Sequence, residues 1–410
     1  MRVTSLLRKI LDQKHTKVTG LLFESDGLVI DVAPTTRAAR CSGCHRRVSR
    51  AWDARERIWR HLDFAGMRVE LRYRVRRVAC ESCGVKTELV PWAEHGSRFT
   101  RDFEDMVALL LQKVDKTTAC TLMGIAWEST GAIAARVVAR RGPNDLIEGL
   151  THIGIDEISY KKGHYYLTVV TDHIRRCVVW VGIGRNKETV GAFFAQLGKE
   201  RAAKLRVVSL DMAQSYITAM REHAPQAVQV FDRFHVQRLA HDALDEVRRE
   251  QMRELRGTDD ARAIKHTRWA LHKRPWNVSV KDDEKLCSVQ QNNLPLYRAY
   301  LLKEMLADVL DRRQPHIART LLNSWIGWAQ RSQLQPFRKL AGTVRRHLDG
   351  IVEYVRTRMS NALAEGINSK IRVATKQAYG FRNPDSLKAM IYLRCSGVVI
   401  PLVRHRPQLQ

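Results

Sequence analysis

The segment that starts at residue 151 orders its elements in a way that few folds can accommodate. Three strand-like runs come first, with short turns between them, and helices and strands then alternate. The strand-like runs cover residues 151–155, 164–172, 177–183, 206–210 and 227–231, and the helical ones cover 189–197, 215–222 and a long stretch from 233 onward. A meander followed by helix, strand, helix and strand predicts one mixed sheet with helices packed on it.

This order is that of a ribonuclease-H-like fold, in which the first strand lies beside the strand that follows the first helix. Asp156 comes directly after the first strand and Asp211 directly after the fourth. Because open α/β sheets build their sites at the carboxyl ends of strands, we expect these two acids to be neighbours. Two adjacent carboxylates repel one another and stay ionised when Mg²⁺ or Mn²⁺ neutralises them.

A third acid, Glu365, lies in a run with helical character, residues 361–370, which also carries Asn361, Asn368 and Lys370. Three carboxylates of this kind suit two-metal phosphoryl transfer, in which the ions activate the attacking oxygen and stabilise the leaving one. On spacing alone Glu353 and Asp349 are rivals for Glu365. Taken singly, each acid could also be a surface charge or a helix cap.

The charge of the chain favours a polyanionic partner. Lys and Arg number 70 against 43 Asp and Glu, a net charge of +27, and much of the excess lies from Arg312 onward. Such a field attracts nucleic acid, since phosphate contacts supply most nonspecific affinity. The alternatives are a merely basic soluble protein or one that meets an acidic membrane surface. No apolar run is long enough to span a membrane and no signal peptide is recognisable, so we expect a cytoplasmic, nucleoid-associated protein.

Four of the eight cysteines form two Cys-x-x-Cys pairs, Cys41 with Cys44 and Cys80 with Cys83. Two such turns can complete a tetrahedral four-cysteine zinc site, which is structural because no position is left for water. The alternatives are four unrelated cysteines or a redox pair. Between the pairs, residues 67–79 alternate like a strand that leads into the second pair, with Arg68, Arg72, Arg74 and Arg76 on one side. That side could contact phosphates or simply face solvent.

Residues 100–141 change to a helical pattern. A capped helix begins at Thr100, and a short helix, a turn at Gly124 and a second helix follow. This order predicts a helix-turn-helix, although any pair of hairpin helices looks similar. Ser129 and Thr130 would begin the recognition helix, which ends in Arg136, Arg140 and Arg141, and we expect these five residues to contact DNA.

A helical segment of more than a hundred residues separates the fifth strand from Glu365. It contains four tryptophans, Trp269, Trp276, Trp325 and Trp328. Aromatic rings at helical spacing are usually core residues, but they could also stack on a base at a DNA strand end.

Several motifs together resemble the DDE transposases of bacterial insertion sequences, specifically the ISL3 family. They are the Cys-x-x-Cys pairs, the helix-turn-helix, Gly154-Ile-Asp-Glu with Lys162-Gly-His164, Ser209-Leu-Asp-Met, Phe231-Asp-Arg-Phe-His235, residues 361–372 and Tyr379-Gly-Phe381. The resemblance implies a Mg²⁺-dependent triad of Asp156, Asp211 and Glu365 that acts on double-stranded DNA. It also implies supporting roles for Asp232 and His235, DNA contacts by Lys370 and Arg372, and a homodimer or larger assembly on paired ends.

We therefore expect a transposase that binds terminal inverted repeats and catalyses strand cleavage and transfer. A catalytically inactive, domesticated DNA-binding regulator on the same scaffold is the alternative, and a repair or resolving nuclease is a third. The expected division is a zinc-binding β module (1–95), a helix-turn-helix (96–145), a ribonuclease-H-like catalytic core (146–240 and 351–410, the latter with a basic tail) and a helical insertion (241–350).

Overall fold

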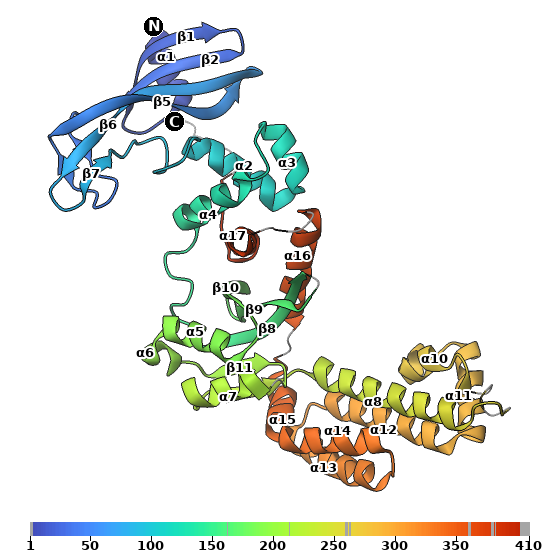
Figure 1. Ribbon diagram of the computed structural model, residues 1–410. Coiled ribbons are helices and arrows are strands. Elements are labelled where there is room, and N and C mark those ends of the chain that lie inside the picture. The colour runs from blue at the N-terminus through green and yellow to red at the C-terminus, as the bar shows by residue number, and fades with distance from the viewer. Residues whose placement is uncertain are drawn as a thin grey trace, which may run out of the picture. The chain divides into compact units, whose positions relative to one another are not determined.

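The computed structural model describes residues 3–161, 163–212, 214–258, 261, 264–359, 362–378, 381 and 383–401. The chain divides into two compact units. Unit 1 contains Met1–Asn144 and Val373–Gln410, and unit 2 contains Asp145–Arg372. Each unit is described by itself below, with the element labels of Figure 1. The finer division into five domains stays a prediction.

Unit 1 begins with a short helix, α1 (Val3–Leu11), and a sheet in the order β1-β2-β6-β5, with β7 paired to β6. The strands are β1 (Thr16–Glu24), β2 (Gly27–Pro34), β5 (Ala51–Phe64), β6 (Met67–Cys80) and β7 (Gly84–Thr87). β1 and β2 form a hairpin whose turn lies between Glu24 and Gly27, and the predicted alternating strand before Cys80 is confirmed. Trp59 and Trp92 fill the core of this sheet with their rings edge to face.

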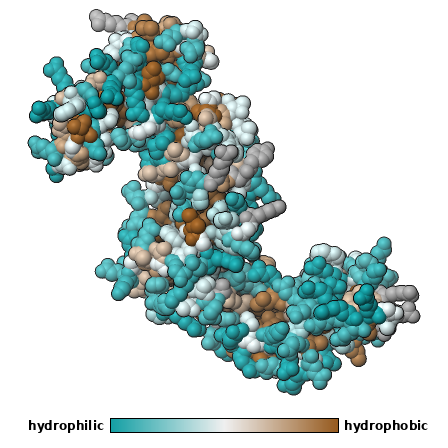
Figure 2. Space-filling view, viewed as in Figure 1, coloured by the Kyte–Doolittle hydropathy of each residue, from teal (hydrophilic) through white to brown (hydrophobic). Residues whose placement is uncertain are grey.

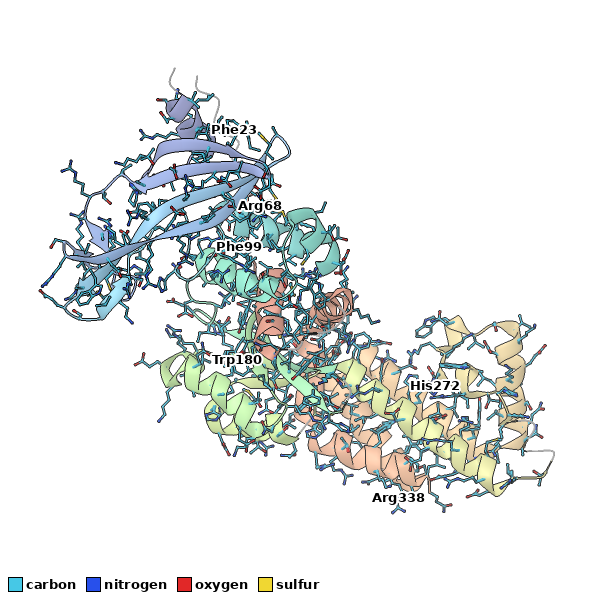
Figure 3. The ribbon with its side chains drawn as sticks, turned by 45° about the horizontal axis from the view of Figure 1, so that its top comes forward. Phe23, Arg68, Phe99, Trp180, His272 and Arg338 are labelled. Carbon is cyan, nitrogen blue, oxygen red and sulfur yellow. The ribbon has the colours of Figure 1, made fainter. Side chains whose placement is uncertain are left out.

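The helical part of unit 1 consists of α2 (Arg101–Lys113), α3 (Lys116–Met123), α4 (Ser129–Arg141) and α17 (Pro384–Cys395). Thr100 caps α2 as predicted, and Gly124 ends α3 in the left-handed conformation that a turn requires. Figure 3 labels Phe99, which stacks on Phe103 where α2 begins.

The last helix of the chain is part of this helical group. Helices α2, α4 and α17 share one apolar cluster, and Gly131 lets α4 approach α17 so closely that a Cβ there would lie 2.3 Å from Ser386 Oγ. Arg394 of α17 also donates to the Leu111 and Val114 carbonyls at the end of α2. The helix-turn-helix is therefore completed by residues from the far end of the sequence.

Unit 2 is built on a five-stranded sheet in the order β10-β9-β8-β11-β12. Its strands are β8 (His152–Lys161), β9 (Tyr165–Asp172), β10 (Cys177–Ile183), β11 (Val207–Leu210) and β12 (Val228–Phe231). The first three are antiparallel neighbours, and β11 runs parallel to both β8 and β12. The predicted adjacency of the first and fourth strands is thus confirmed.

One strand differs from the sequence expectation. β8 does not end before Asp156 but continues to Lys161, because β9 keeps pairing with it from Asp156↔Val169 to Lys161↔Tyr165. Asp156 therefore lies within a strand, at the level where the neighbouring β11 ends.

Helices cover this sheet and close its core. They are α5 (Lys187–Leu197), α6 (Lys199–Ala202), α7 (Gln214–His223) and α15 (Leu348–Thr357). Trp180, labelled in Figure 3, packs against Phe193 of α5. On β12, Gly350 of α15 allows a close approach, since a Cβ there would meet the Phe231 ring at 2.3 Å.

The predicted helical insertion is present in unit 2 as a group of helices. It comprises α8 (Arg233–Glu254), α10 (Arg268–His272), the short 3-10 helix η1 (Pro275–Asn277), α11 (Val280–Asn292), α12 (Leu294–Asp311), α13 (Pro315–Arg331) and α14 (Gln335–Arg346). Trp325 is fully buried there and donates its indole N–H to Leu302 O at 2.8 Å. In the view of Figure 2 the surface of this part is largely hydrophilic. No helix within the described residues is both long and apolar enough to cross a membrane.

Candidate functional site

Asp156 and Asp211 are brought together by strand register. β11 pairs with β8 in parallel up to Leu210↔Ile155. The residue that follows Leu210 is Asp211, and the residue that follows Ile155 is Asp156. Each carboxylate accepts a hydrogen bond from the backbone N–H that follows it, Glu157 at 2.8 Å and Met212 at 2.6 Å. These bonds hold the carboxylates at the end of the β11–β8 ladder.

Gly154, two residues before Asp156, is required by the packing behind the site. A Cβ at this position would lie 2.8 Å from Thr171 Oγ1, 2.9 Å from His173 Nε2 and 3.1 Å from Ser209 Oγ. His173 and Ser209 are themselves hydrogen-bonded at 2.8 Å. Because all of these atoms are close to one another, β8 can lie beside β11 only with glycine here.

The start of α8 lies against Asp211. Asp232 follows β12 directly and caps α8, with its carboxylate accepting from Phe234 N at 3.1 Å. His235, in the first turn, places Nδ1 3.5 Å from Asp211 Oδ1, and an Arg238 guanidinium nitrogen lies 3.8 Å from Asp211 Oδ2. Asp232 therefore orients the helix, while His235 and Arg238 provide positive or hydrogen-bonding groups beside the acid.

Helix α16 (Ala362–Gln377) reaches Asp156 through Asn368. The Asn368 amide is buried and donates to Asp156 Oδ2 at 2.8 Å. Glu365 is exposed and lies three residues earlier, in the first turn of α16, so it shares a helix face with Asn368. Lys370 and Arg372 are exposed on the same helix. Asn361, Lys162, Tyr379 and Gly380 lie outside the described residues.

The two rivals of Glu365 are engaged elsewhere. Glu353 of α15 accepts from Arg356 Nε at 2.7 Å within its own helix. Asp349 pairs with Arg319 at 2.7 Å, and its side chain is 91% exposed. Neither has the link to Asp156 that α16 makes through Asn368.

Burial raises the pKa of Asp156 to about 6, the Glu157 N–H opposes this shift, and the Asp211 carboxylate adds to it. The carboxylates do not form a closed cage: the four cysteines are the only group of three or more potential ligands in the described part of the chain whose donor atoms all lie within 4.8 Å. This open pair of hard oxygen donors fits a divalent cation such as Mg²⁺, which keeps several of its waters.

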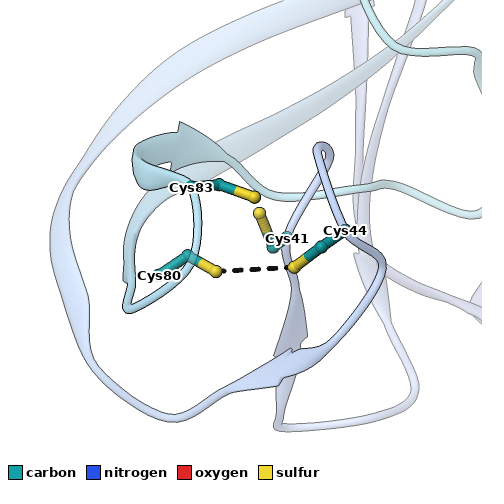
Figure 4. A group of neighbouring side chains, drawn as sticks. All are labelled: Cys41, Cys44, Cys80 and Cys83. Carbon is teal, nitrogen blue, oxygen red and sulfur yellow. Dashed lines mark hydrogen bonds between the residues drawn. The ribbon is translucent and has the colours of Figure 1, made fainter.

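The cysteine pairs meet at the end of the β6–β7 hairpin, as Figure 4 shows. Their four sulfur atoms lie within 4.8 Å of one another, and Cys44 Sγ is 3.5 Å from Cys80 Sγ. Sulfurs bound to one zinc ion at about 2.3 Å lie roughly 3.8 Å apart, so the arrangement fits a tetrahedral site. A Cβ on Gly43 would meet Cys83 Sγ at 3.0 Å, and Gly84 has a φ of +71°, so glycine is needed beside each pair.

In the helix-turn-helix, Thr130 does not face solvent. Its side chain is buried, and Oγ1 donates to Trp127 O at 2.8 Å. Ser129 is half-buried and accepts from Arg98 at 2.9 Å. In this arrangement Thr130 is a packing residue of α4, because its hydroxyl is buried out of reach of a base edge and its proton is donated to the backbone.

The three arginines of α4 are tied to buried carboxylates of α2. Arg136 donates to Glu104 at 2.7 Å, and both Arg140 and Arg141 bond Asp105. Their guanidinium groups form ion pairs between α4 and α2, which favours a structural role over the predicted DNA contacts. The exposed positions of α4 include Ala132, Ala135 and Ala139, which the sequence pattern did not single out.

Most arginines on the predicted polar side of β6 are likewise paired. Arg68 pairs with Glu70 at 2.6 Å, Arg72 with Asp31 at 2.7 Å and Arg76 with Glu88 at 2.6 Å. Arg68 is labelled in Figure 3. A solvated strand face stabilised by ion pairs accounts for these arginines without phosphate contacts.

Three family models match the chain in succession. A zinc finger of the IS204/IS1001/IS1096/IS1165 transposases matches residues 37–83, and the helix-turn-helix domain of transposase family ISL3 matches residues 88–138. A model described as a transposase, that of the ISL3 DDE domain, matches residues 153–391, more than half of the chain.

Curated relatives match over nearly their whole length. The chain is 37% identical over 443 residues to the transposase for insertion sequence element IS1557 of Mycobacterium tuberculosis, covering 100% of this chain and 98% of the relative. It is 31% identical over 362 residues to the transposase for insertion sequence element IS1001 of Bordetella parapertussis, covering 87% and 89%. With its zinc-finger, helix-turn-helix and DDE segments in this order, the chain belongs to the ISL3 family of transposases.

Proposed function

We propose that this transposase binds the terminal inverted repeats of its insertion sequence and catalyses Mg²⁺-dependent strand cleavage and strand transfer on a ribonuclease-H-like core. The observation that carries the proposal is the register of β11 on β8, which makes neighbours of Asp156 and Asp211 although they are far apart in sequence. The sheet order β10-β9-β8-β11-β12 supports the choice of core.

Asp156, Asp211 and Glu365 are the proposed Mg²⁺ ligands. When bound, Mg²⁺ supplies the charge that activates an attacking oxygen and stabilises the leaving oxygen in an in-line displacement at phosphorus. The chain's own residues prepare the site: Asn368 orients the Asp156 carboxylate, Arg238 offsets the charge of Asp211, and the His235 ring lies beside the Asp211 carboxylate. Lys370 and Arg372 lie further along α16, where their exposed charges suit DNA phosphates.

Glu365→Gln is expected to reduce cleavage and joining of labelled element-end DNA by about a thousandfold, since losing a metal ligand removes several kcal/mol of transition-state stabilisation. The end DNA is chosen by searching the DNA that flanks the gene for inverted repeats, and binding is followed separately by mobility shift. Glu353→Gln is the matched control, because that acid pairs with Arg356 in its own helix. Loss of activity with Glu353→Gln but not with Glu365→Gln would reverse the assignment of the third acid.

Asn368→Ala tests how Asp156 is held. The amide donates to the charged form of the carboxylate, so its loss is expected to lower activity about 10- to 100-fold and to move the rise of the pH–rate profile to higher pH. The pH profile separates this role from a packing defect, which would lower the rate equally at every pH. An unchanged profile in a folded Asn368→Ala protein contradicts the positioning role.

The four cysteines are proposed to hold one structural Zn²⁺, supported by the sulfur cluster and by the zinc-finger family match. A homodimer or larger assembly on paired ends is also proposed, and it rests on the family alone.

A further inference from the structure

The end of unit 1 that holds the cysteine cluster carries a small hairpin that the sequence pattern did not single out. Its strands are β3 (Ala39–Arg40) and β4 (Arg47–Val48), and the first Cys-x-x-Cys pair lies between them. Figure 4 shows this pair facing the second one, Cys80 and Cys83. The hairpin is therefore one of the two segments that the cysteines join.

The hairpin places two arginines directly opposite one another. Arg40 pairs in register with Arg47, and both side chains are exposed. Like charges at directly opposed positions of an antiparallel pair are destabilising, and β3 and β4 share only one other position, Ala39↔Val48. The free protein therefore carries a repulsion that a bound anion would relieve.

Two further cations lie beside this pair. Arg46 comes directly before Arg47, and Arg50 follows β4. Arg46 donates to the Ser82 hydroxyl at 3.4 Å. Within the described residues, no ion pair joins Arg40, Arg46, Arg47 or Arg50 to a carboxylate. Four guanidinium groups close together in sequence are thus left without an acid of the chain itself.

The arginines of β6 differ in this respect. Arg68, Arg72, Arg76 and Arg77 each form an ion pair with a carboxylate of the same module. Their charge is largely neutralised, whereas the charge of the β3–β4 hairpin is not. Within this comparison, the hairpin is the surface that still attracts an anionic ligand.

A cavity of about 450 Å³ is lined by β4 and by the second Cys-x-x-Cys turn. Its lining includes Arg46, Arg47 and Arg50, with Glu81 as the single acid. Pockets for small organic ligands are lined mainly by apolar side chains. This cavity instead offers cations and serine hydroxyls, the groups that bind phosphate oxygens.

A second cavity, of about 610 Å³, shares Arg47 with the first. Lys14, His15, Arg40 and His45 also line it, and the one acid in its lining already pairs with an arginine of β6. Because the two basic cavities meet at Arg47, an anion with several charges along its length fits them better than a single small ion does.

The first cavity is also braced across its walls. Arg50 O accepts a hydrogen bond from Ala79 N at 3.2 Å, and Arg46 reaches Ser82, the residue before Cys83. The four proposed zinc ligands belong to the same two segments. The proposed zinc site therefore also fixes the shape of this cavity.

We propose that the β3–β4 hairpin binds the sugar–phosphate backbone of the DNA, with Arg47 at the centre and Arg40, Arg46 and Arg50 around it. Guanidinium groups bind phosphate oxygens through paired hydrogen bonds, and such contacts hold a duplex without reading its sequence. The hairpin then fixes the position of the duplex, and base reading is left to other parts of the chain. This proposal rests on the proposed function, since it assigns backbone contacts to the DNA bound there.

The test measures binding of the full, zinc-loaded chain, without Mg²⁺, to two duplexes of equal length. One has the element-end sequence, and the other has the same bases in shuffled order. Arg47→Gln is expected to weaken binding of both duplexes about five- to tenfold and to lower the slope of log K against log salt by about one. Its thermal stability should stay equal or rise, because the repulsion with Arg40 is lost.

Arg50→Gln is a second variant that leaves both strands of the hairpin intact, and it should lower affinity and salt slope in the same way. Arg68→Gln is the matched control. It removes the same charge from the same module, but Arg68 pairs with Glu70 and lies at the other end of β6 from Cys80. Its affinity and salt slope should equal those of wild type.

Unchanged affinity and slope in both Arg47→Gln and Arg50→Gln overturn the proposal. A loss confined to the element-end duplex also overturns it, because such a loss indicates base reading. A wild type that binds both duplexes equally, in a manner that depends on Arg47, defeats the recognition of element ends but not the backbone site. A wild type that prefers the element end, with the arginine variants unaffected, defeats only the backbone site.

Discussion

Asp156→Asn is expected to abolish Mg²⁺-dependent cleavage and joining of element ends, by at least about a thousandfold, while the protein still binds the same DNA. The amide is isosteric, but it is a poor ligand for a divalent cation and cannot neutralise one, so several kcal/mol of transition-state stabilisation are lost. Labelled end DNA with Mg²⁺ measures both activities. A wild type that cuts no better than the variant, although both bind, supports the domesticated regulator instead.

The same substitution should stabilise the metal-free protein. Burial raises the pKa of Asp156 from 3.8 to about 6, so the folded state binds a proton more tightly than the unfolded state does. Wild-type stability therefore falls as pH rises from about 4 to about 6, by up to about 3 kcal/mol, and stays low above that window. The asparagine side chain carries no charge, so the variant does not lose this stability as pH rises.

Thermal unfolding at pH 5 and pH 8 checks this without knowledge of the inverted repeats. The variant should gain stability over wild type mainly at pH 8, and Mg²⁺ should raise the Tm of wild type more than that of the variant. Equal Mg²⁺ shifts in both proteins would mean that the cation does not bind at Asp156.

Cys80→Ser is expected to remove the zinc and unfold the β6–β7 end of unit 1. Apparent binding free energies of structural zinc sites are about 10–16 kcal/mol, comparable to the whole stability of a domain. Metal analysis should give close to one zinc per wild-type chain and far less in the variant. Binding of end DNA should fall with it, while unit 2 stays folded because its core is separate.

Cys287→Ser is the matched control, since Cys287 is exposed and lies outside the cysteine cluster. It should retain full zinc content and full DNA binding. Zinc well below one equivalent in wild type, or zinc retained by Cys80→Ser, contradicts the four-cysteine site.

Much of the fold was predictable because strand and helix periods are local. The first and last residues of the third strand, 177–183, were predicted correctly, and the adjacency of β8 and β11 followed from element order alone. The predicted end of β8 was wrong because residues 156–161 are held in the strand by pairing with β9 across a hairpin, and the composition of these residues alone does not reveal that pairing.

The direction in which a side chain points was harder to predict than the secondary structure. Arg136, Arg140 and Arg141 are basic residues on a recognition-type helix, a pattern typical of DNA contact, yet they meet Glu104 and Asp105 of a helix thirty residues earlier. The four tryptophans look alike in sequence, and only tertiary packing separates buried Trp325 from exposed Trp276.

For the candidate site, the two aspartates followed from strand order, whereas Glu365 followed from a motif. The bond between Asn368 and Asp156 spans 212 positions of sequence and links a helix to a strand. No spacing rule foresees such a contact, although the motif that holds Glu365 already contained Asn368.

The place of α17 has a consequence for how this chain matures. Helix α17 covers α4, but a ribosome makes it tens of seconds later at about 5–20 residues per second. Every proposed catalytic residue has by then been synthesised. The helix-turn-helix unit is therefore finished only in chains that include α17, and a product that stops before Pro384 leaves the apolar face of α4 uncovered. A chain that ends before α17 can thus contain every proposed catalytic residue and still lack a fully packed helix-turn-helix.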